Sequence, residues 1–400
     1  MTDPLGQSQV IPYLIGLSKE HQITIISFEK KNNFNSKQQT IQTILSTNKI
    51  VWKPLLYHKN PPILSTLFDI FILRKKSVSL YKIEKFDIVH CRSYVASLVG
   101  LFLNKKYGIK FIFDMRGFWA DERVEGNIWN KNKFHYRLIY NFFKRMEIKF
   151  LESADCVIAL TNAAKEYLER PTPAPSQKEG KLIFKLKNPI IVIPCCADLE
   201  LFKPQIDSRK SIRKELEVEN KFVLVYLGSI GTWYMLEEML DFFIENKKEN
   251  KNLVFLFITN EIDFVKKTIK EKNISENDIV IRNAARTEVP KYLSAADSAI
   301  FFIKPVFSKM ASSPVKHGEI LGCHLPLICN DKIGDVSEIV EQSETGVIIE
   351  KFDEQNYLDG FEKLKLLIQK GNINFALPAN KYYSLKSGIE KYSEIYNNLK

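Results

Sequence analysis

Short apolar segments alternate with longer amphipathic segments along most of the chain. In the first half, the apolar runs typical of buried strands are residues 22–28, 87–90, 110–114, 156–160 and 190–193. Between them, apolar residues recur at helical spacing in residues 10–18, 94–104 and 136–153. Strands that alternate with helices predict parallel sheets covered by helices, so the expected fold class is α/β.

The same alternation restarts in the second half. Strands are predicted at 222–226, 253–258, 278–281, 298–302 and 325–329, and helices at 236–246, 262–272, 289–295, 314–321 and 336–341. We therefore expect two doubly wound domains, 1–193 and 217–380, joined by a linker at 194–216. A last helix, within 381–400, either closes the second domain or crosses back onto the first. The Pro-rich stretch 170–180 predicts an exposed, mobile loop.

Composition limits the classes of function. The 400 residues carry a net charge of +11, but only 11 of the 58 basic residues are Arg. A Lys-rich excess indicates mainly a solvated surface, with attraction to anionic membrane second and nucleic-acid binding well behind. Six cysteines without a C-x-x-C pair predict buried thiols rather than a zinc site or disulfides.

No apolar run is long enough to span a bilayer; residues 63–73 come nearest, but they are too few and include Asp69. The start of the chain lacks the pattern of a signal peptide, so a cytoplasmic location is expected. Residues 131–149 hold six basic residues interleaved with apolar ones. Such a helix either lies on an anionic membrane or buries its apolar side in the domain core, and we favour the core.

A glycine-containing turn follows the predicted strand 222–226. Gly228 and Gly231 allow close approach of the backbone to a ligand, and Ser229 and Thr232 offer hydroxyl groups. In doubly wound folds, ligands bind at such turns at the carboxyl ends of strands. A phosphate site and a turn that serves packing alone are equal alternatives here.

A second candidate site opens the helix at 314–321. Ser313 is a good N-cap and Pro314 suits the first helical position. Lys316 then places a cation in the first turn, which is unfavourable for the helix dipole unless an anion binds there. Glu319 lies on the same face and can accept hydrogen bonds from the two hydroxyls of a ribose. The alternative is an ordinary exposed Lys–Glu pair.

The first half holds weaker candidates. The segment 114–123, which follows a predicted strand, combines Arg116, Trp119, Asp121 and Glu122, which suit binding of a polar acceptor or, equally, internal salt bridges. His90 ends another strand and is either structural or a hydrogen-bond partner of a sugar. Gly6 lies in a short segment that looks like a glycine loop before a helix.

Taken in order, these motifs resemble the bacterial GT-B glycosyltransferases, and more narrowly the retaining family-four group. The matching segments are GQSQ, VHCRSY, DMRGFWADE, VIPCCADLELF, YLGSIGTWY, SSPVKHGEILGCHLPLI and GDVSEIV. The resemblance covers residues 5–349. It implies two Rossmann-like domains facing a cleft and transfer of a sugar from a nucleotide-sugar of the UDP or GDP type, with no metal and no dissociable cofactor. The acceptor implied is a glycan or lipid-linked molecule of the cell envelope, with the inner-membrane surface as a further partner and no nucleic acid.

The resemblance also implies roles for individual residues. The donor would contact Gly228, Ser229, Gly231, Thr232, Ser312, Ser313, Pro314, Val315, Lys316 and Glu319. Gly231 and Thr232 would approach the diphosphate, Ser313 and Val315 would donate backbone N–H groups, and Glu319 would hold the ribose. Lys316 would serve catalysis by stabilising the leaving diphosphate, with Arg116 and His90 as further catalytic candidates. The acceptor side would include Gly6, Arg116, Trp119, Asp121 and Glu122.

Three departures from the family pattern keep alternatives open. Ala311 stands where the family's first glutamate is expected, and Ser229 replaces a basic pair, for which Lys304 or Lys309 is a substitute. The first strand of the N-terminal domain is absent, so we expect the full gene product to extend upstream of Met1. The alternatives to a transferase are a nucleotide-sugar epimerase of the same fold and a non-catalytic partner subunit.

Overall fold

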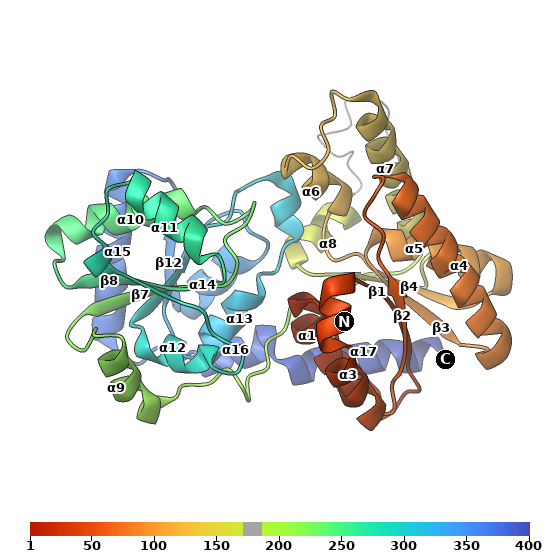
Figure 1. Cartoon of the computed structure of the whole chain (residues 1–400), viewed down its shortest axis with the longest axis horizontal. Helices are drawn as coiled ribbons and strands as arrows, with labels where there is room; N and C mark the ends of the chain where they lie inside the picture. The colour runs from red at the N-terminus through yellow and green to blue at the C-terminus, as the bar shows by residue number, and fades with distance from the viewer. Residues whose placement is uncertain (171–185) are drawn as a thin grey trace. The chain divides into compact units, whose positions relative to one another are not determined.

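The computed structural model describes residues 1–170 and 186–400, which form two compact units. One unit consists of Met1–Ile193 and Leu385–Lys400, and the other of Pro194–Ser384. Each is an α/β domain built on parallel strands, which confirms the predicted fold class (Figure 1). Nearly all of the loop predicted at 170–180 lies outside the described residues.

The first unit contains two parallel sheets, with strand orders β1-β2 and β3-β4-β5-β6. Its strands are β1 (Thr24–Glu29), β2 (Val51–Leu56), β3 (Ile88–Arg92), β4 (Lys110–Asp114), β5 (Cys156–Ala159) and β6 (Ile190–Val192). Its helices are α1 (Pro4–Gln9), α2 (Ile11–Leu17), α3 (Lys31–Thr47), α4 (Leu64–Glu84), α5 (Tyr94–Tyr107), α6 (Trp119–Glu125), α7 (Phe134–Ser153), α8 (Asn162–Glu169) and α17 (Leu385–Leu399). Helix α5 packs on β3 and β4 and contacts both α4 and α7.

The last helix, α17, belongs to the first unit, which decides the alternative that the sequence left open. The last helix, expected within 381–400, begins at Leu385, because residues 381–383 belong to the preceding helix, α16 (Ala376–Tyr383), whose C-cap is Ser384. Helix α17 packs on α2, and its Tyr396 and Tyr392 reach side chains in the middle of β3 and at the end of β4. The expectation that His90 ends its strand is wrong, because β3 continues to Arg92.

The second unit has one six-stranded parallel sheet in the order β12-β11-β10-β7-β8-β9. The strands are β7 (Phe222–Leu227), β8 (Leu253–Ile258), β9 (Ile279–Arg282), β10 (Ser298–Phe301), β11 (Leu327–Asn330) and β12 (Gly346–Ile349). The helices are α9 (Ile206–Glu215), α10 (Leu236–Glu249), α11 (Ile262–Glu271), α12 (Val289–Ala295), α13 (Val315–Gly322), α14 (Val336–Ser343), α15 (Glu354–Lys370) and α16, with 3₁₀ turns at Glu276–Asp278 (η1) and Phe307–Ala311 (η2).

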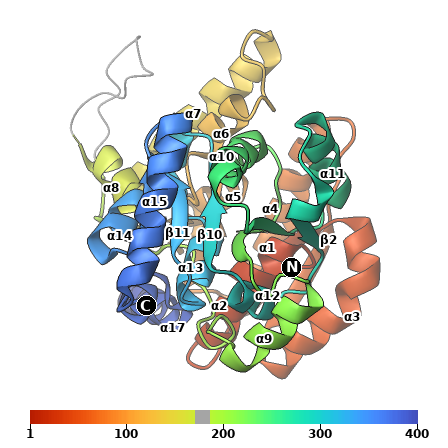
Figure 2. The same ribbon diagram turned by 90° about the vertical axis from the view of Figure 1, so that its left-hand side faces the viewer.

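The order of this sheet reverses between β7 and β10. From β7, the next strands β8 and β9 are added toward one edge of the sheet. Strand β10 pairs with the other side of β7, and β11 and β12 continue toward the opposite edge. Right-handed crossovers therefore place α10 and α11 on one face and α13 and α14 on the other, as Figures 1 and 2 show. Ligands of open α/β sheets bind outside the carboxyl ends of the strands at such a reversal.

Residues 194–216, which were predicted to form a linker, are instead part of the second unit, so this prediction is wrong. Two arginines fix its helix α9 to the end of α12. Arg209 donates to the carbonyl groups of Ser294 and Ala296 and pairs with Asp297 at 2.5 Å, and Arg213 reaches the same carboxylate at 3.2 Å.

Candidate functional site

The two motifs of the second unit that the sequence singled out meet at the sheet reversal. The turn after β7 contains Gly228 at φ +105° and Gly231 at φ +33°. A Cβ atom on Gly228 would lie 3.3 Å from the side-chain nitrogen of Lys316, in the first turn of α13. The turn and the start of this helix therefore form one site, although about 85 residues separate them in the sequence.

Lys316 is buried in an aromatic environment, with 7% of its surface exposed. Its Nζ donates to the hydroxyl of Tyr226 at 3.0 Å and lies 3.4 Å from the ring centre of Tyr234. Burial holds the pKa of Lys316 well below its ordinary value. Among the described residues it forms no ion pair, so an anionic ligand would supply the missing charge.

Tyr226, the next-to-last residue of β7, joins the turn to the helix. Its hydroxyl accepts from Lys316 and donates to the carbonyl of Ser229 at 2.5 Å. Glu261 holds the same turn from the other side by accepting from the backbone N–H of Ile230 at 2.6 Å. Gly231 and Thr232 are exposed at the rim of the turn.

Lys309, one of the two substitutes proposed for the missing basic pair, packs against this turn. It is buried, and its ammonium lies 3.7 Å from the ring centre of Trp233. Lys304 is exposed, and its backbone N–H donates to the carbonyl of Trp233. Both lysines thus lie beside the turn, and Lys309 adds a second buried cation to the site. Ala311 is buried at the end of η2.

Glu319 is also buried, with 6% of its surface exposed. Its Oε1 accepts from the guanidinium of Arg286 at 2.6 Å, and that guanidinium lies over the ring of Phe202. The alternative of an exposed Lys–Glu pair is therefore wrong, because both residues are buried and each has another partner. Arg286, in the segment between β9 and α12, was not singled out from the sequence because no local motif marks it.

The expected N-cap at Ser313 is also wrong. Helix α13 begins at Val315, its N-cap is Pro314, and no side chain caps it. The hydroxyl of Ser313 instead accepts from the backbone N–H of Cys195 at 3.1 Å, which fixes residues 195 and 313 together. Without a side-chain cap, the first N–H groups of α13 are available to a ligand.

His317, on the opposite side of α13 from the turn, is structural. It is fully buried and bonds through Nδ1 to the hydroxyl of Tyr383 at 2.9 Å. Burial lowers the pKa of His317 to about 3, so the ring stays neutral. This contact anchors α13 to α16 and leaves the first turn, with Lys316, to face the site.

In the first unit, His90 and Arg116 come together on the carboxylate of Asp114. His90 Nε2 lies 3.4 Å from Asp114 Oδ2, and Arg116 Nη1 lies 3.7 Å from Oδ1. Tyr392 donates to the same carboxylate at 3.1 Å, and Tyr396 bonds to His90 Nδ1 at 2.7 Å. The neighbouring guanidinium and imidazole groups hold the pKa of Asp114 well below its usual range despite burial.

The other residues of the segment 114–123 lie elsewhere. Asp121 is buried and accepts from Tyr140 at 2.7 Å and from Lys144 at 3.0 Å. Trp119 packs among aromatic rings, including Phe143 at 4.8 Å between centroids. Asp121 thus forms an internal salt bridge with Lys144, as the alternative from the sequence proposed, whereas Trp119 packs against neighbouring rings. Glu122 lies on the same helix, α6. Gly6 is inside helix α1 rather than in a loop, and a Cβ there would lie 2.8 Å from Met1 Cα.

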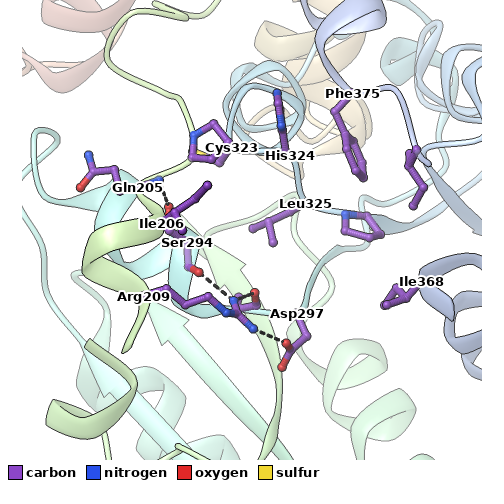
Figure 3. Close-up of a pocket in the computed structure, with 14 residues that line it drawn as sticks. Gln205, Ile206, Arg209, Ser294, Asp297, Cys323, His324, Leu325, Ile368 and Phe375 are labelled. Carbon is purple, nitrogen blue, oxygen red and sulfur yellow. Dashed lines mark hydrogen bonds and ion pairs between the residues drawn. The ribbon is translucent and has the colours of Figure 1, made fainter. Parts of the chain in front are cut away.

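A separate cavity of about 350 Å³ lies at the amino ends of β10 and β11 (Figure 3). Its polar wall is the Arg209–Asp297 pair with the carbonyl of Ser294, and its apolar wall includes Leu325 and Phe375. None of the predicted site residues lines it. It lies at the opposite end of the strands from the candidate site.

The described residues contain neither a metal cluster nor a membrane-spanning helix. Within residues 1–170 and 186–400, no group of three or more His, Cys, Asp or Glu side chains is arranged to hold a metal ion. No helix in this part of the chain is long and apolar enough to cross a membrane. The six cysteines are all buried thiols, as expected.

Two family models match consecutive parts of the chain. The model for glycosyltransferase family 4 matches residues 14–201, and that for glycosyl transferases group 1 matches residues 207–369. The chain is a glycosyltransferase of this type. Its candidate site, with the Gly228 turn and α13, lies within the group 1 match. No curated protein sequence matches this glycosyltransferase.

Solved structures show the same fold. Sucrose-phosphate synthase from Thermosynechococcus elongatus has a TM-score of 0.69 at 14% identity, over 94% of this chain and 98% of that one. HepE from Anabaena, in complex with UDP-glucose, has a TM-score of 0.65 at 14% identity, over 99% and 98%. UDP-GlcNAc 2-epimerase from Neisseria meningitidis, bound to UDP-GlcNAc, has a TM-score of 0.55 at 13% identity, over 98% and 96%. At these identities the likeness establishes the GT-B fold of the glycosyltransferase.

Proposed function

We propose that this glycosyltransferase transfers a hexosyl group from a UDP- or GDP-type nucleotide-sugar to a glycan or lipid-linked acceptor. The observation that carries the proposal is the buried ammonium of Lys316, which has no ion pair among the described residues and lies beside Gly228 and the uncapped start of α13. A cation and free N–H groups at the same point suit a diphosphate.

The nucleoside end of the donor would lie one turn further along α13, at Glu319. Arg286 binds Oε1 of this carboxylate, and Oε2 forms no bond with the described residues. A carboxylate fixed at one oxygen is well placed to accept hydrogen bonds from ribose hydroxyls through the other. The HepE structure in complex with UDP-glucose supports a donor of this class.

The chemical role of the site is to stabilise the departing diphosphate. As the glycosidic bond to the phosphate breaks, negative charge grows on the leaving oxygen, and Lys316 with the N–H groups of α13 would compensate it. These groups neutralise the charge in place of a metal ion. Retention of anomeric configuration is part of the proposal and is supported by the resemblance to the retaining family-four enzymes.

The acceptor would bind on the first unit, near the carboxyl ends of β3 and β4. The ionised Asp114 orients His90 and Arg116, whose side chains are then fixed for hydrogen bonding to a sugar hydroxyl. The acceptor proposed is a glycan or lipid-linked intermediate of cell-envelope polysaccharide synthesis, as the bacterial resemblance implies.

A donor screen tests the proposal. Purified protein is incubated with UDP-, GDP- and ADP-sugars, with and without a lipid extract of bacterial membranes, and free nucleotide is measured. Nucleotide release that requires the extract supports a transferase, and NMR of the product gives its anomeric configuration.

The fold likeness to the Neisseria epimerase favours an epimerase as the second candidate, which would change the sugar of the donor without any acceptor. A protein that binds none of the nucleotides is instead a partner subunit.

A further inference from the structure

Helix α17 carries two tyrosines that reach the His90–Asp114 pair of the first unit. Tyr392 and Tyr396 are four residues apart, which places them one turn from each other on the same face of the helix. The hydroxyl of Tyr396 lies 2.7 Å from His90 Nδ1, and that of Tyr392 bonds to Asp114 Oδ2 at 3.1 Å. One helix face therefore contacts both members of the pair.

The hydroxyl groups of both tyrosines keep their protons. Burial raises the pKa of each tyrosine, and the nearby charge of Asp114 raises it further. Tyr392 is the donor in its bond to Asp114, since an ionised carboxylate can only accept. The hydroxyl of Tyr396 has no hydrogen-bond partner among the described residues other than His90, so its proton is directed at Nδ1.

A hydrogen bond from Tyr396 to Nδ1 fixes the tautomer of His90. A neutral imidazole has one nitrogen that carries a proton and one that accepts. With Nδ1 as the acceptor, the proton lies on Nε2, which is 3.4 Å from the ionised carboxylate of Asp114. An N–H group facing this carboxylate is attracted to it, whereas a bare nitrogen lone pair would be repelled. The contacts on both sides of the ring therefore require the same tautomer.

The packing of α17 on the end of helix α2 keeps both tyrosines in place. Ser393, in the turn between them, donates to the carboxylate of Glu20 and bonds to His21 Nε2 at 3.0 Å. Gly16 allows the two helices to approach closely, because a Cβ atom there would lie 2.4 Å from Ile389 Cδ1. These contacts fix the rotation of α17 and with it the direction of its tyrosine hydroxyls.

We propose that Tyr396 is a positioning residue, whose hydroxyl holds the imidazole of His90 in one orientation with the ring proton on Nε2. Tyr392 fixes the carboxylate of Asp114 in the same way. Since the lone pair of Nδ1 is occupied and Nε2 carries a proton, His90 orients its neighbours and does not act as a base. The use of this pair in acceptor binding rests on the proposed function, whereas the contact between Tyr396 and His90 does not.

NMR of the full chain labelled with ¹⁵N-histidine tests the proposal. The variant His90→Gln removes the signals of His90 and so assigns them among the six histidines. In mildly alkaline buffer, wild type should show a protonated Nε2 and an unprotonated Nδ1. The Nδ1 resonance should shift in Tyr396→Phe toward that of an imidazole nitrogen without a donor, and it should stay in place in Tyr392→Phe.

Turnover with a nucleotide-sugar and a bacterial lipid extract shows whether the reaction depends on this contact. Tyr396→Phe should lower turnover by about 10-fold and leave the affinity for the donor as in wild type. In a His90→Gln background the same change should lower turnover no further, because the hydroxyl acts only through His90. The matched control is Tyr107→Phe, a tyrosine of α5 that packs against Tyr81. It should change neither the His90 signals nor turnover.

A His90 Nδ1 resonance that does not move in Tyr396→Phe, or a protonated Nδ1 in wild type, would overturn the proposal. So would losses of turnover that add fully in the double variant, since the hydroxyl would then act independently of His90. Circular dichroism checks that every variant is folded. Wild type without turnover on any donor would contradict the proposed function instead, and the NMR result would still decide whether Tyr396 fixes His90.

Discussion

The ammonium of Lys316 lies 3.0 Å from the hydroxyl oxygen of Tyr226, and that hydroxyl donates to the carbonyl of Ser229. These two bonds connect the first turn of α13 to the glycine turn after β7. Because the aromatic rings around Lys316 carry no full charge, its ammonium is held in place without being neutralised. The site therefore combines a fixed position with an amine that has no ion pair among the described residues and whose pKa burial lowers.

Removing the tyrosine hydroxyl should loosen this connection. Tyr226→Phe keeps the ring but leaves Lys316 and the Ser229 carbonyl each without a partner. At about 1 kcal/mol per hydrogen bond, nucleotide affinity should fall by roughly 5-fold to 30-fold, measured by calorimetric titration. Tyr357→Phe, a buried tyrosine packed against Phe242 and Phe302, is the control and should bind as wild type does. Equal affinities in wild type and Tyr226→Phe would show that the hydroxyl has no part in the donor site.

Replacing Lys316 should lower turnover without lowering the free energy of unfolding. Lys316→Met fills the same aromatic environment without a charge, so the free energy of unfolding should stay the same or rise. Turnover should fall by about 100-fold, and more than affinity does, because the lost interaction is strongest with the departing diphosphate. Lys291→Met, an exposed lysine on α12, should change neither quantity. A variant that loses stability but keeps turnover contradicts the assigned role.

The depressed pKa of Lys316 predicts a pH dependence of stability. Between the lowered pKa of the folded state and about 10.5, the unfolded chain binds a proton that the folded chain does not. The free energy of unfolding therefore gains a contribution that rises with pH across this window. Denaturation curves of wild type and Lys316→Met at several alkaline pH values should converge as pH increases. A diphosphate favours the ammonium form, so nucleotide binding in the same window should take up a proton; release of a proton would refute this.

Glu319 should be the residue through which the protein prefers ribose nucleotides over 2′-deoxyribose nucleotides. Glu319→Ala should weaken nucleotide-sugar binding by roughly 1.5–3 kcal/mol if it accepts charged hydrogen bonds from the sugar. Wild type should prefer UDP or GDP over the 2′-deoxy form, and Glu319→Ala should lose that preference. Arg286→Ala should weaken the binding of both the ribose and the 2′-deoxyribose nucleotide, because it leaves the buried carboxylate of Glu319 without its partner. A preference for ribose that survives in Glu319→Ala would assign the ribose contact to another residue.

Asp114 should matter for stability and turnover but not for donor binding. Asp114→Asn leaves Arg116 and His90 without their shared anion, which should cost about 3–5 kcal/mol of unfolding free energy at pH 7. Since the pKa of Asp114 is lowered in the folded state, its stabilisation is present above the unfolded pKa near 4 and is lost as pH falls below it. Chemical denaturation at pH 7 and below pH 4 checks this, and titration with UDP should give the wild-type affinity. Weaker UDP binding in a folded variant would contradict the placement of Asp114 outside the donor site.

Sequence reasoning found the parts of the site that local chemistry marks. Glycines after a strand and a lysine at a helix start stand out in the sequence, because each conflicts with ordinary local preferences. Arg286 and Tyr226 were missed because their role exists only once the chain is folded: one lies in an unremarkable segment, and the other looks like any aromatic strand residue. Ser313 was wrong as an N-cap because a distant backbone N–H, that of Cys195, binds its hydroxyl.

The elements of the fold likewise fall into those that the sequence predicted and those that it did not. Strands such as β7 and β8 are fully apolar and were predicted, whereas no element was expected at β2 or α4. Strand β2 contains Lys53 and Pro54, which blur its pattern, and a proline fits there because β2 has only β1 as a neighbour. Helix α4 carries apolar residues on its exposed side as well as its buried side, so the periodicity that reveals a helix is nearly absent.

Titration of the full-length wild type and Lys316→Met with UDP-, GDP- and ADP-sugars tests the central claim most directly. One nucleotide class should bind wild type in a 1:1 ratio, and addition of a bacterial lipid extract should then release the free nucleotide. Lys316→Met should bind the same donor more weakly and release almost none. Failure of every donor to bind the folded wild type would contradict a donor site at Gly228 and α13.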